Sequence, residues 1–163
     1  MERIGVTELV SVGAYQNVPA KIDTGADASA IWASKIRITK DGLLKFALFG
    51  EGAPHYTGKV LTRSDYGVAK VKSSNGTMQL RYRTHLTITI AGKKIRALFY
   101  LSDRSTQKFP IIIGRRTVAH KFLVDAAVKN VKVQRPIKTG LNDQLKADPY
   151  RFHRKHIRKG EKA

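Results

Sequence analysis

Apolar and polar residues alternate along most of the chain up to about residue 134, which predicts a protein built from strands. Ile4 to Val12 is rich in β-branched residues and alternates loosely. A second apolar run, Val18 to Ile22, leads directly into Asp23, and the intervening stretch from Gly13 to Asn17 predicts a turn. We therefore expect two consecutive strands, with an acidic residue at the end of the second.

Two adjacent hairpins are the clearest local prediction. The segments Gly67 to Lys72 and Thr77 to Arg83 flank Ser73-Ser74-Asn75-Gly76. Asn-Gly favours a type I′ turn, because both central residues of that turn need a positive φ. Alternation resumes from Leu86 to Leu101, on both sides of Ala91-Gly92. This second pattern is typical of an antiparallel pair of strands with one apolar face.

The run Ile111-Ile112-Ile113-Gly114 predicts a short strand that is buried on both faces and stops against a closely packed backbone. A helical turn over Arg116 to Lys121 and a last strand from Phe122 to Val124 are expected to complete the domain.

Two earlier segments have weaker patterns. Ala28 to Ile36 predicts a short helix or an irregular turn around Trp32. Asp41 to Gly58 contains four glycines and one proline, which favours a loop or a weak hairpin. We expect one domain over residues 1–134 and a basic C-terminal tail over 135–163, mobile or helical only on binding.

Charge is the unusual feature of the composition. The 31 Lys and Arg against 12 Asp and Glu give a formal net charge of +19. A field of this sign attracts nucleic acid, anionic lipid or an acidic peptide, and charge alone does not choose among them. The absence of cysteine excludes disulfides and thiolate metal sites. No apolar run has the length of a membrane span and no secretory signal begins the chain, so we expect a cytoplasmic protein with no membrane partner.

One short motif carries candidate chemistry. Asp23-Thr24-Gly25 follows the second apolar run. A pair of carboxyl groups that share one proton can hydrolyse a peptide bond, since the ionised acid activates water and the protonated acid polarises the carbonyl. Such a pair needs a tight, glycine-containing turn. A lone Asp-Thr-Gly also fits an ordinary turn at the end of a strand, so the motif needs its context.

That context gives a resemblance to a known family. Asp23-Thr24-Gly25-Ala26-Asp27 resembles the active-site loop of retropepsins, and Ile112-Ile113-Gly114-Arg115 follows a flap-like hairpin in the same order as in those proteases. The bacterial "ATP-dependent zinc protease" family, often encoded beside RimK-type glutamate ligases, is more similar still. Its motifs match Ala20 to Ala26, Val71 to Gly76, Asp103-Arg104 and Phe122 to Asp125.

The resemblance covers roughly residues 4 to 128 and implies the fold and the activity. The expected fold is all-β, a single-domain, retropepsin-like closed β-barrel with a flap hairpin and one short helix. The expected activity is that of an aspartic endopeptidase. Because the chain has one Asp-Thr-Gly, the resemblance implies a homodimer in which each subunit supplies one acid.

The resemblance also implies roles for matching residues. Asp23, Thr24 and Gly25 would form the catalytic set, with Asp23 as the acid, Thr24 as its brace and Gly25 along the backbone path of the substrate. Asp27 would bind the substrate backbone and Arg115 would pair with Asp27. The remaining substrate-binding positions are Ala26 and the flap tip, Ser73, Ser74, Asn75 and Gly76.

The hairpin also predicts a substrate preference. Lys70 and Lys72 are two residues apart, as are Arg81 and Arg83, so each pair shares one face of its strand. If those faces turn toward the cleft, they attract an acidic peptide such as a poly-glutamate tail, and Arg81 joins the substrate-binding residues. Alternatively, these four side chains are solvated and only keep the flap soluble.

We expect no metal and no cofactor. The five histidines are scattered, and neither a His-Glu-x-x-His pattern nor a phosphate-binding loop is present. The alternative to a protease is a catalytically silent module that binds peptide or RNA through its basic surface, with the tail contacting nucleic acid. A metallopeptidase is a third possibility, which chelator-sensitive activity would reveal.

Overall fold

The computed structural model describes residues 1–72, 76–132 and 146–156. The chain divides into two compact units, Met1–Val133 and Gln134–Ala163. In the described part of the chain, no helix is long and apolar enough to cross a membrane. The elements are β1 (Glu2–Val12), β2 (Tyr15–Asp23), β3 (Ser29–Ile38), β4 (Leu44–Leu48), β5 (Val60–Arg63), β6 (Gly67–Lys72), β7 (Met78–Ile90), β8 (Lys93–Ser102), β9 (Ile111–Gly114), α1 (Arg115–Val118), β10 (Phe122–Lys129) and α3 (Pro149–His156).

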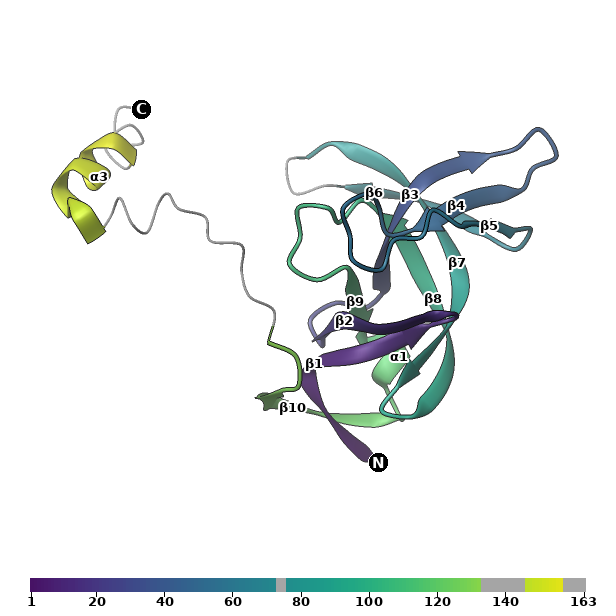
Figure 1. Ribbon diagram of the computed structural model, residues 1–163, viewed down its shortest axis with the longest axis horizontal. Coiled ribbons are helices and arrows are strands. Elements are labelled where there is room, and N and C mark those ends of the chain that lie inside the picture. Colours follow the sequence, from purple (N-terminus) through teal and green to yellow (C-terminus); the bar gives the residue numbers. More distant parts are fainter. Residues whose placement is uncertain (73–75, 133–145, 157–163) are drawn as a thin grey trace. The chain divides into compact units, whose positions relative to one another are not determined.

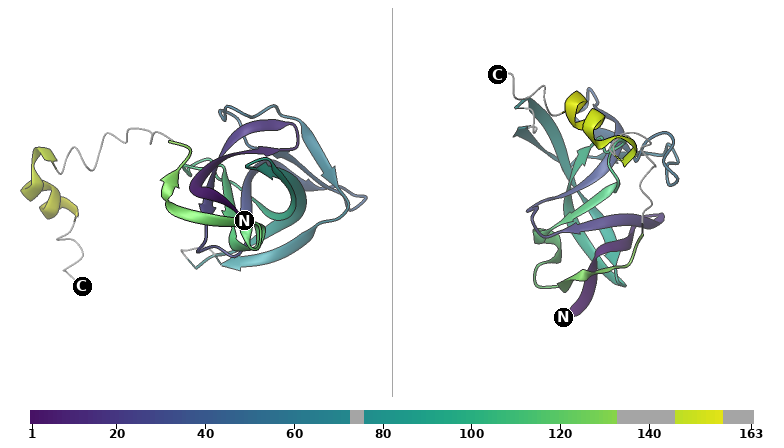
Figure 2. Two further views of the ribbon diagram at one scale, coloured as in Figure 1. Left: turned by 90° about the horizontal axis from the view of Figure 1, so that it is seen from below. Right: turned by 90° about the vertical axis from the view of Figure 1, so that its left-hand side faces the viewer.

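Six strands close into a barrel in the order β1-β2-β9-β3-β8-β7, because β7 pairs back onto β1 (Figure 1). Val10 and Val12 of β1 lie opposite Ile90 and Ile88 at this closure. All four side chains are buried, so the closing strands also contribute to the core. The two views of Figure 2 show the same wrapped sheet from below and from the side. The all-β closed barrel predicted from the sequence is confirmed.

The first predicted hairpin is formed by β6 and β7. These strands are antiparallel, and their last described pair before the turn is Lys72 opposite Met78. Gly76 has a φ of 85°, a value that favours glycine and suits an Asn-Gly turn. The predicted flap-tip residues Ser73, Ser74 and Asn75 lie outside the described residues.

The second predicted hairpin is formed by the rest of β7 and by β8. Ile90 lies opposite Lys93, which leaves Ala91 and Gly92 as a two-residue loop. Both loop residues have a positive φ, 47° and 78°, as a type I′ turn requires. One long strand, β7, therefore serves both hairpins and also closes the barrel on β1.

The triple-isoleucine strand β9 lies inside the sheet. It runs parallel to β2 on one side and antiparallel to β3 on the other. Ile111 and Ile113 are fully buried, while Ile112 on the opposite face is half-buried. The chain turns from Gly114 directly into α1, so the predicted helical turn begins at Arg115, one residue earlier than expected.

The prediction of a helix or irregular turn over Ala28 to Ile36 was wrong. This segment forms most of β3, which lies between β8 and β9. Ser29, Ile31 and Ala33 are buried in alternation, which is the period of a strand. Pairing on both sides satisfies the backbone and overrides the intrinsic helical preference of the alanines.

The stretch from Asp41 to Gly58 is more ordered than a loop or weak hairpin. Its centre is β4, which pairs antiparallel with both β3 and β5. Leu44 and Phe46 of β4 are fully buried. The glycines occupy the connections on either side of β4, so their number did not reveal the short apolar strand between them.

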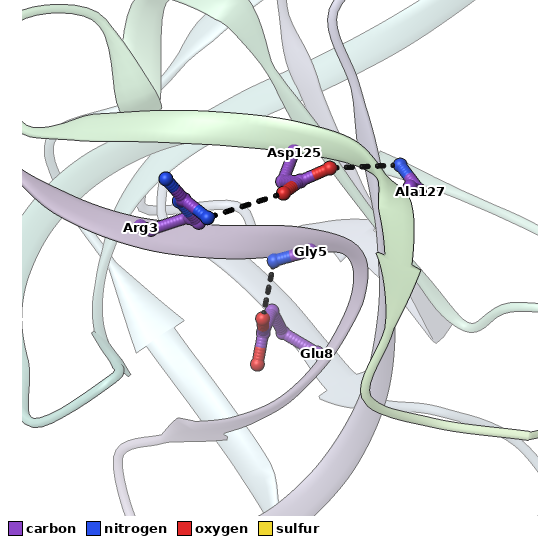
Figure 3. A network of polar contacts seen from close by, with 5 residues as sticks. All are labelled: Arg3, Gly5, Glu8, Asp125 and Ala127. Carbon is purple, nitrogen blue, oxygen red and sulfur yellow. Dashed lines mark hydrogen bonds and ion pairs between the residues drawn. The ribbon is translucent and has the colours of Figure 1, made fainter.

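The predicted last strand is longer than expected. It forms β10, which continues to Lys129 and runs parallel to β1. Figure 3 shows the polar contacts at this pairing: Arg3 lies 3.6 Å from the Asp125 carboxylate, which also accepts a hydrogen bond from the Ala127 N–H. Nearby, buried Glu8 accepts a hydrogen bond from the Gly5 N–H at 2.7 Å.

At the other end of β1, the turn expected over Gly13 to Asn17 is shorter, because β2 already begins at Tyr15.

The second unit contains a helix with its own start signal. α3 begins at Pro149, and the Arg151 N–H donates to the Asp148 carboxylate at 3.0 Å. This is the arrangement of an N-cap aspartate followed by proline at the first helical position. The tail is predicted to be mobile or helical only on binding, and the structure has a helix over Pro149–His156.

The position of β4 makes a stability prediction. Phe46→Ala removes a fully buried ring and should lower the free energy of unfolding by about 3–5 kcal/mol. Leu80→Ala, at a position that is 62% exposed, should change it by less than about 0.5 kcal/mol. Urea titrations of both variants measure the difference, with Phe46→Leu as a milder version. Equal effects of the two alanine variants would show that β4 does not belong to the core.

Candidate functional site

Asp23 is the last residue of β2, and a tight turn follows it. The Ala26 N–H donates to the Asp23 carbonyl at 3.1 Å, and the Gly25 N–H donates to the Asp23 carboxylate oxygen Oδ1, also at 3.1 Å. The Asp23 side chain is 34% exposed. The fold therefore presents one partly accessible carboxylate whose orientation is fixed by a backbone donor.

Thr24 and Gly25 occupy the exposed part of this turn. A Cβ atom at position 25 would lie 3.3 Å from Asp23 Oδ1, so glycine leaves room for the carboxylate. Backbone groups close the turn, and the described residues include no hydrogen-bond partner for the Thr24 hydroxyl. The predicted bracing role of Thr24 therefore stays a prediction about the assembled dimer.

The loop after Asp23 is held by the end of β9. The Arg115 N–H donates to the Ala26 carbonyl at 2.8 Å and the Arg116 N–H donates to the Asp27 carbonyl at 3.2 Å. A Cβ atom at Gly114 would overlap the Ala28 carbonyl and lie 2.8 Å from the Asp27 oxygen. Glycine is required at position 114 because two backbones meet there.

Ser29 completes this junction from inside. Its hydroxyl oxygen accepts a hydrogen bond from the Gly114 N–H at 3.0 Å and lies 2.7 Å from the Thr117 hydroxyl. Ser29 and Thr117 are both buried. The serine thus satisfies a backbone donor that the tight packing would otherwise leave without a partner. Sequence reasoning missed both residues, although their positions beside the two motifs were a usable signal.

Asp27 pairs with two arginines. Its carboxylate lies 3.5 Å from the Arg115 guanidinium, as the resemblance implied, and 2.7 Å from that of Arg116. The shorter contact belongs to Arg116, which sequence reasoning did not identify. All three side chains are at least half exposed, so the ion pairs contribute little stability, and the backbone contacts hold the loop.

Lys21 is a second site residue that sequence reasoning missed. Its ammonium lies 3.6 Å from Asp23 Oδ2, and its side chain is 49% exposed. The two residues are two positions apart in β2, so their side chains leave the same face of the strand. The candidate catalytic carboxylate therefore has a cation beside it in the single chain.

The four hairpin cations divide between two faces, which corrects part of the sequence interpretation. Lys70 lies opposite Leu80, whereas Ala69 lies opposite Arg81, and directly paired residues share a face. Lys70 and Lys72 are therefore on one face of the hairpin, and Arg81 and Arg83 are on the other. Both pairs cannot turn toward the cleft together.

The arginine face is the one directed toward the site. Arg83 donates to the Tyr100 hydroxyl at 3.4 Å and lines a groove of about 420 Å³ beside Asp27. Arg81 lies near Arg104, whose partial burial, with the neighbouring positive charge, lowers the pKa of the Arg104 guanidinium. Asp27 is the one acid among the residues that line the groove, whose cations are Arg83, Arg96, Arg116 and Lys121.

Comparison with known families shows to which family this chain belongs. The family model described as RimB-like, retropepsin-like aspartic endopeptidase RimB, matches residues 4–135. The chain belongs to this RimB-like family. The match includes the Asp23 turn, the flap hairpin and the Gly114 junction, so the resemblance stated from the sequence is confirmed.

Two groups of relatives extend the comparison. Proteins named probable alpha-L-glutamate ligase, from Shewanella pealeana and Shewanella halifaxensis, are each 28% identical over 111 residues, or 66% of this chain. The match spans about a quarter of those proteins, 24% of their length. A Legionella pneumophila protein of unknown function has a similar fold, with a TM-score of 0.60 and 24% identity over 78% of this chain and 95% of its own.

The described residues of this RimB-like chain offer no group of three or more His, Asp or Glu side chains arranged to hold a metal ion. Among the described residues, the Gly25 N–H and the Lys21 ammonium are the polar groups that contact the Asp23 carboxylate. The chemistry that this arrangement can supply is that of carboxyl groups.

The Ser29 contact makes a testable prediction. Ser29→Ala should lower the free energy of unfolding by about 1–3 kcal/mol, because it leaves the buried Gly114 N–H without an acceptor. Ser11→Ala is the matched control: the hydroxyl of Ser11 makes an exposed hydrogen bond to Gln16, and its loss should cost less than about 0.5 kcal/mol. Chemical denaturation compares the two. An equal, small effect of both variants would show that Ser29 does not support the junction.

Proposed function

We propose that this chain is an aspartic endopeptidase whose active site forms when two copies bring their Asp23 carboxyl groups together. The observation that carries the proposal is the rigid presentation of one partly exposed carboxylate, oriented by the Gly25 N–H on a loop fixed by residues 114–117. Membership of the RimB-like family supports it. One chain supplies one acid, so the proposed chemistry requires a homodimer.

The proposed reaction is hydrolysis of a peptide bond by a shared-proton pair. The ionised Asp23 takes a proton from water as the water oxygen bonds to the peptide carbonyl carbon, and the protonated Asp23 of the second copy gives its proton to the carbonyl oxygen. The resulting diol collapses when the C–N bond breaks and the nitrogen takes a proton from the first carboxyl group. The diol hydroxyl returns a proton to the second, which regenerates the pair.

We further propose an acidic substrate, such as a poly-glutamate tail on a protein. The groove beside Asp27 is lined by four cationic side chains and one acid, and Lys21 lies beside Asp23. The relatives named alpha-L-glutamate ligases are 28% identical to this chain over 111 residues, which supports a connection with glutamate-containing substrates. Arg81 and Arg83 are the hairpin cations suited to this role, and Lys70 and Lys72 are not.

A binding module is the second candidate function. The observation that favours it lies in α3, where the Arg154 guanidinium is 5.4 Å from the centre of the exposed Tyr150 ring. Exposed arginine and aromatic groups in a chain of net charge +19 suit contacts with nucleic acid. Under this alternative, the barrel is a scaffold and its Asp23 turn is catalytically silent.

The dimeric site makes a prediction about Asp23. Asp23→Asn should reduce peptide cleavage by about 10²- to 10⁴-fold, because it removes the acid–base group. Cleavage by the wild type should resist chelators. A mixing experiment tests the need for two acids. After equal amounts of wild type and variant exchange subunits freely, only about a quarter of the dimers carry two acids. Because the mixture contains twice as many dimers as its wild-type protein forms alone, its activity should be about half that of this wild-type protein before mixing.

Three results would count against this proposal. Chelator-sensitive cleavage that survives Asp23→Asn would identify a metallopeptidase. Full activity of the mixed dimers would show that one acid suffices. A demonstrated dimer that cleaves no glutamate-rich peptide, but binds RNA with an affinity that falls steeply with salt, would favour the binding module.

A further inference from the structure

A row of paired residues crosses the outer face of the barrel wall beside Asp23. Lys21 of β2 lies opposite Ile112 of β9, and Ile112 lies opposite Ala30 of β3. Ala30 in turn lies opposite Tyr100 of β8, which lies opposite Arg83 of β7. Directly paired residues project from the same face of a sheet, so these five form one line, here called the cleft row.

The cleft row faces away from the core. None of its five members is buried, whereas their neighbours along each strand are buried, with the exception of half-buried Tyr82. Those buried neighbours are Ala20, Ile22, Ser29, Ile31, Thr84, Phe99, Leu101, Ile111 and Ile113. Asp23 belongs to the same face, one step further along β2 from Lys21 and opposite Gly114 of β9. The row is therefore the accessible surface that adjoins the candidate catalytic carboxylate.

The two charged members of the row stand at its opposite ends. Counted along the row, four strand steps of about 4.8 Å each lead from Lys21 to Arg83, and the curvature of the closed barrel makes the direct distance shorter than this path. Lys21 is in contact with Asp23, at 3.6 Å between ammonium and carboxylate, while Arg83 contacts Tyr100. Of the two charged members of the row, Lys21 is therefore the one placed next to the bond that Asp23 would cleave.

We propose that Lys21 is a specificity-determining residue, which binds the carboxylate of an acidic side chain directly beside the scissile bond. This inference rests on the proposed function. An extended peptide advances about 3.3 Å per residue, so a side chain flanking the scissile bond lies within one strand step of the Lys21 ammonium. Next to Lys21 in the row lie Ile112 and Ala30, which form an apolar surface beside the substrate side chain. Neither residue is an acid that would compete with the substrate carboxylate for Lys21.

A charge count explains why Lys21 stays available in the assembled site. Two Asp23 carboxyl groups that share one proton carry a single negative charge. Two copies of Lys21, one beside each acid, carry two positive charges. The pair of carboxyl groups therefore neutralises only one lysine, and an acidic substrate side chain can pair with the other.

The test compares how wild type and variants discriminate glutamate from glutamine. A library of glutamate-rich peptides first locates a cleaved bond by mass spectrometry. Peptide pairs that carry Glu or Gln at each residue flanking that bond then give a ratio of kcat/KM values. We expect the wild type to prefer Glu at one flanking position by roughly tenfold, the size of a hydrogen bond to a charged group.

Three variants separate Lys21 from the general positive charge of the cleft. Lys21→Met should bring the Glu/Gln ratio at the flanking position close to one, whereas Lys21→Arg should keep a preference for Glu. Arg83→Met is the matched control at the far end of the row: it should leave the flanking ratio unchanged while lowering the preference for Glu at a more distant position. Circular dichroism and sedimentation confirm that each variant is a folded dimer.

The outcomes distinguish this inference from the function on which it rests. A wild-type dimer that cleaves no peptide overturns the protease proposal and this inference with it. Cleavage by the wild type with a flanking Glu/Gln ratio that is near one, or that Lys21→Met leaves unchanged, overturns only the assignment of Lys21. Loss of cleavage of both peptides in Lys21→Met, with Lys21→Arg active, places Lys21 in the chemical step and overturns a specificity role.

Discussion

The candidate site depends on one close backbone contact, between the end of β9 and the loop that follows Asp23. Gly114 leaves the space that the Ala28 carbonyl occupies, and the next two N–H groups bind the carbonyls of Ala26 and Asp27. Since β9 is itself held between β2 and β3, this contact ties the loop to the barrel wall. In the proposed catalytic pair, each carboxyl group shares a proton with its copy across roughly 3 Å, an arrangement that tolerates little movement of the loop.

The same strands that build the core also place the chemistry. β2 alternates, so Ile22 points into the barrel while Lys21 and Asp23 share the other face. The parallel pairing with β9 then sets Asp23 opposite Gly114, where the loop is fastened. A closed barrel therefore has a rigid outer face on which a reactive group can stand half exposed. With one acid per chain, the other half of the proposed catalytic pair is a second copy of this surface.

Sequence patterns correctly predict those elements whose conformation depends mainly on neighbouring residues in the chain. The Asn-Gly hairpin and the triple-isoleucine strand were recognised because turn chemistry and burial on both faces leave direct marks in the sequence. β3 was taken for a helix or an irregular turn, because its strand state depends on β8 and β9, which come later in the chain. The contacts of Arg116 with Asp27 and of Ser29 with Gly114 likewise arise from the packing of residues 114–117 on the loop, although Ser29 already lies beside a motif in the sequence.

The register of the strand pairing, rather than the number of charges, determines which basic residues of this chain lie near the candidate site. The sequence places four cations in the flap hairpin, and pairing sends Lys70 and Lys72 to one face and Arg81 and Arg83 to the other. Distant cations attract an acidic partner through a field that salt screens over about 8–10 Å. Lys21 acts at contact distance from Asp23, where screening is weaker. The net charge of +19 can therefore accelerate encounter with any polyanion, while the proposed choice of the bond to be cleaved rests on the contact of one lysine in β2 with Asp23.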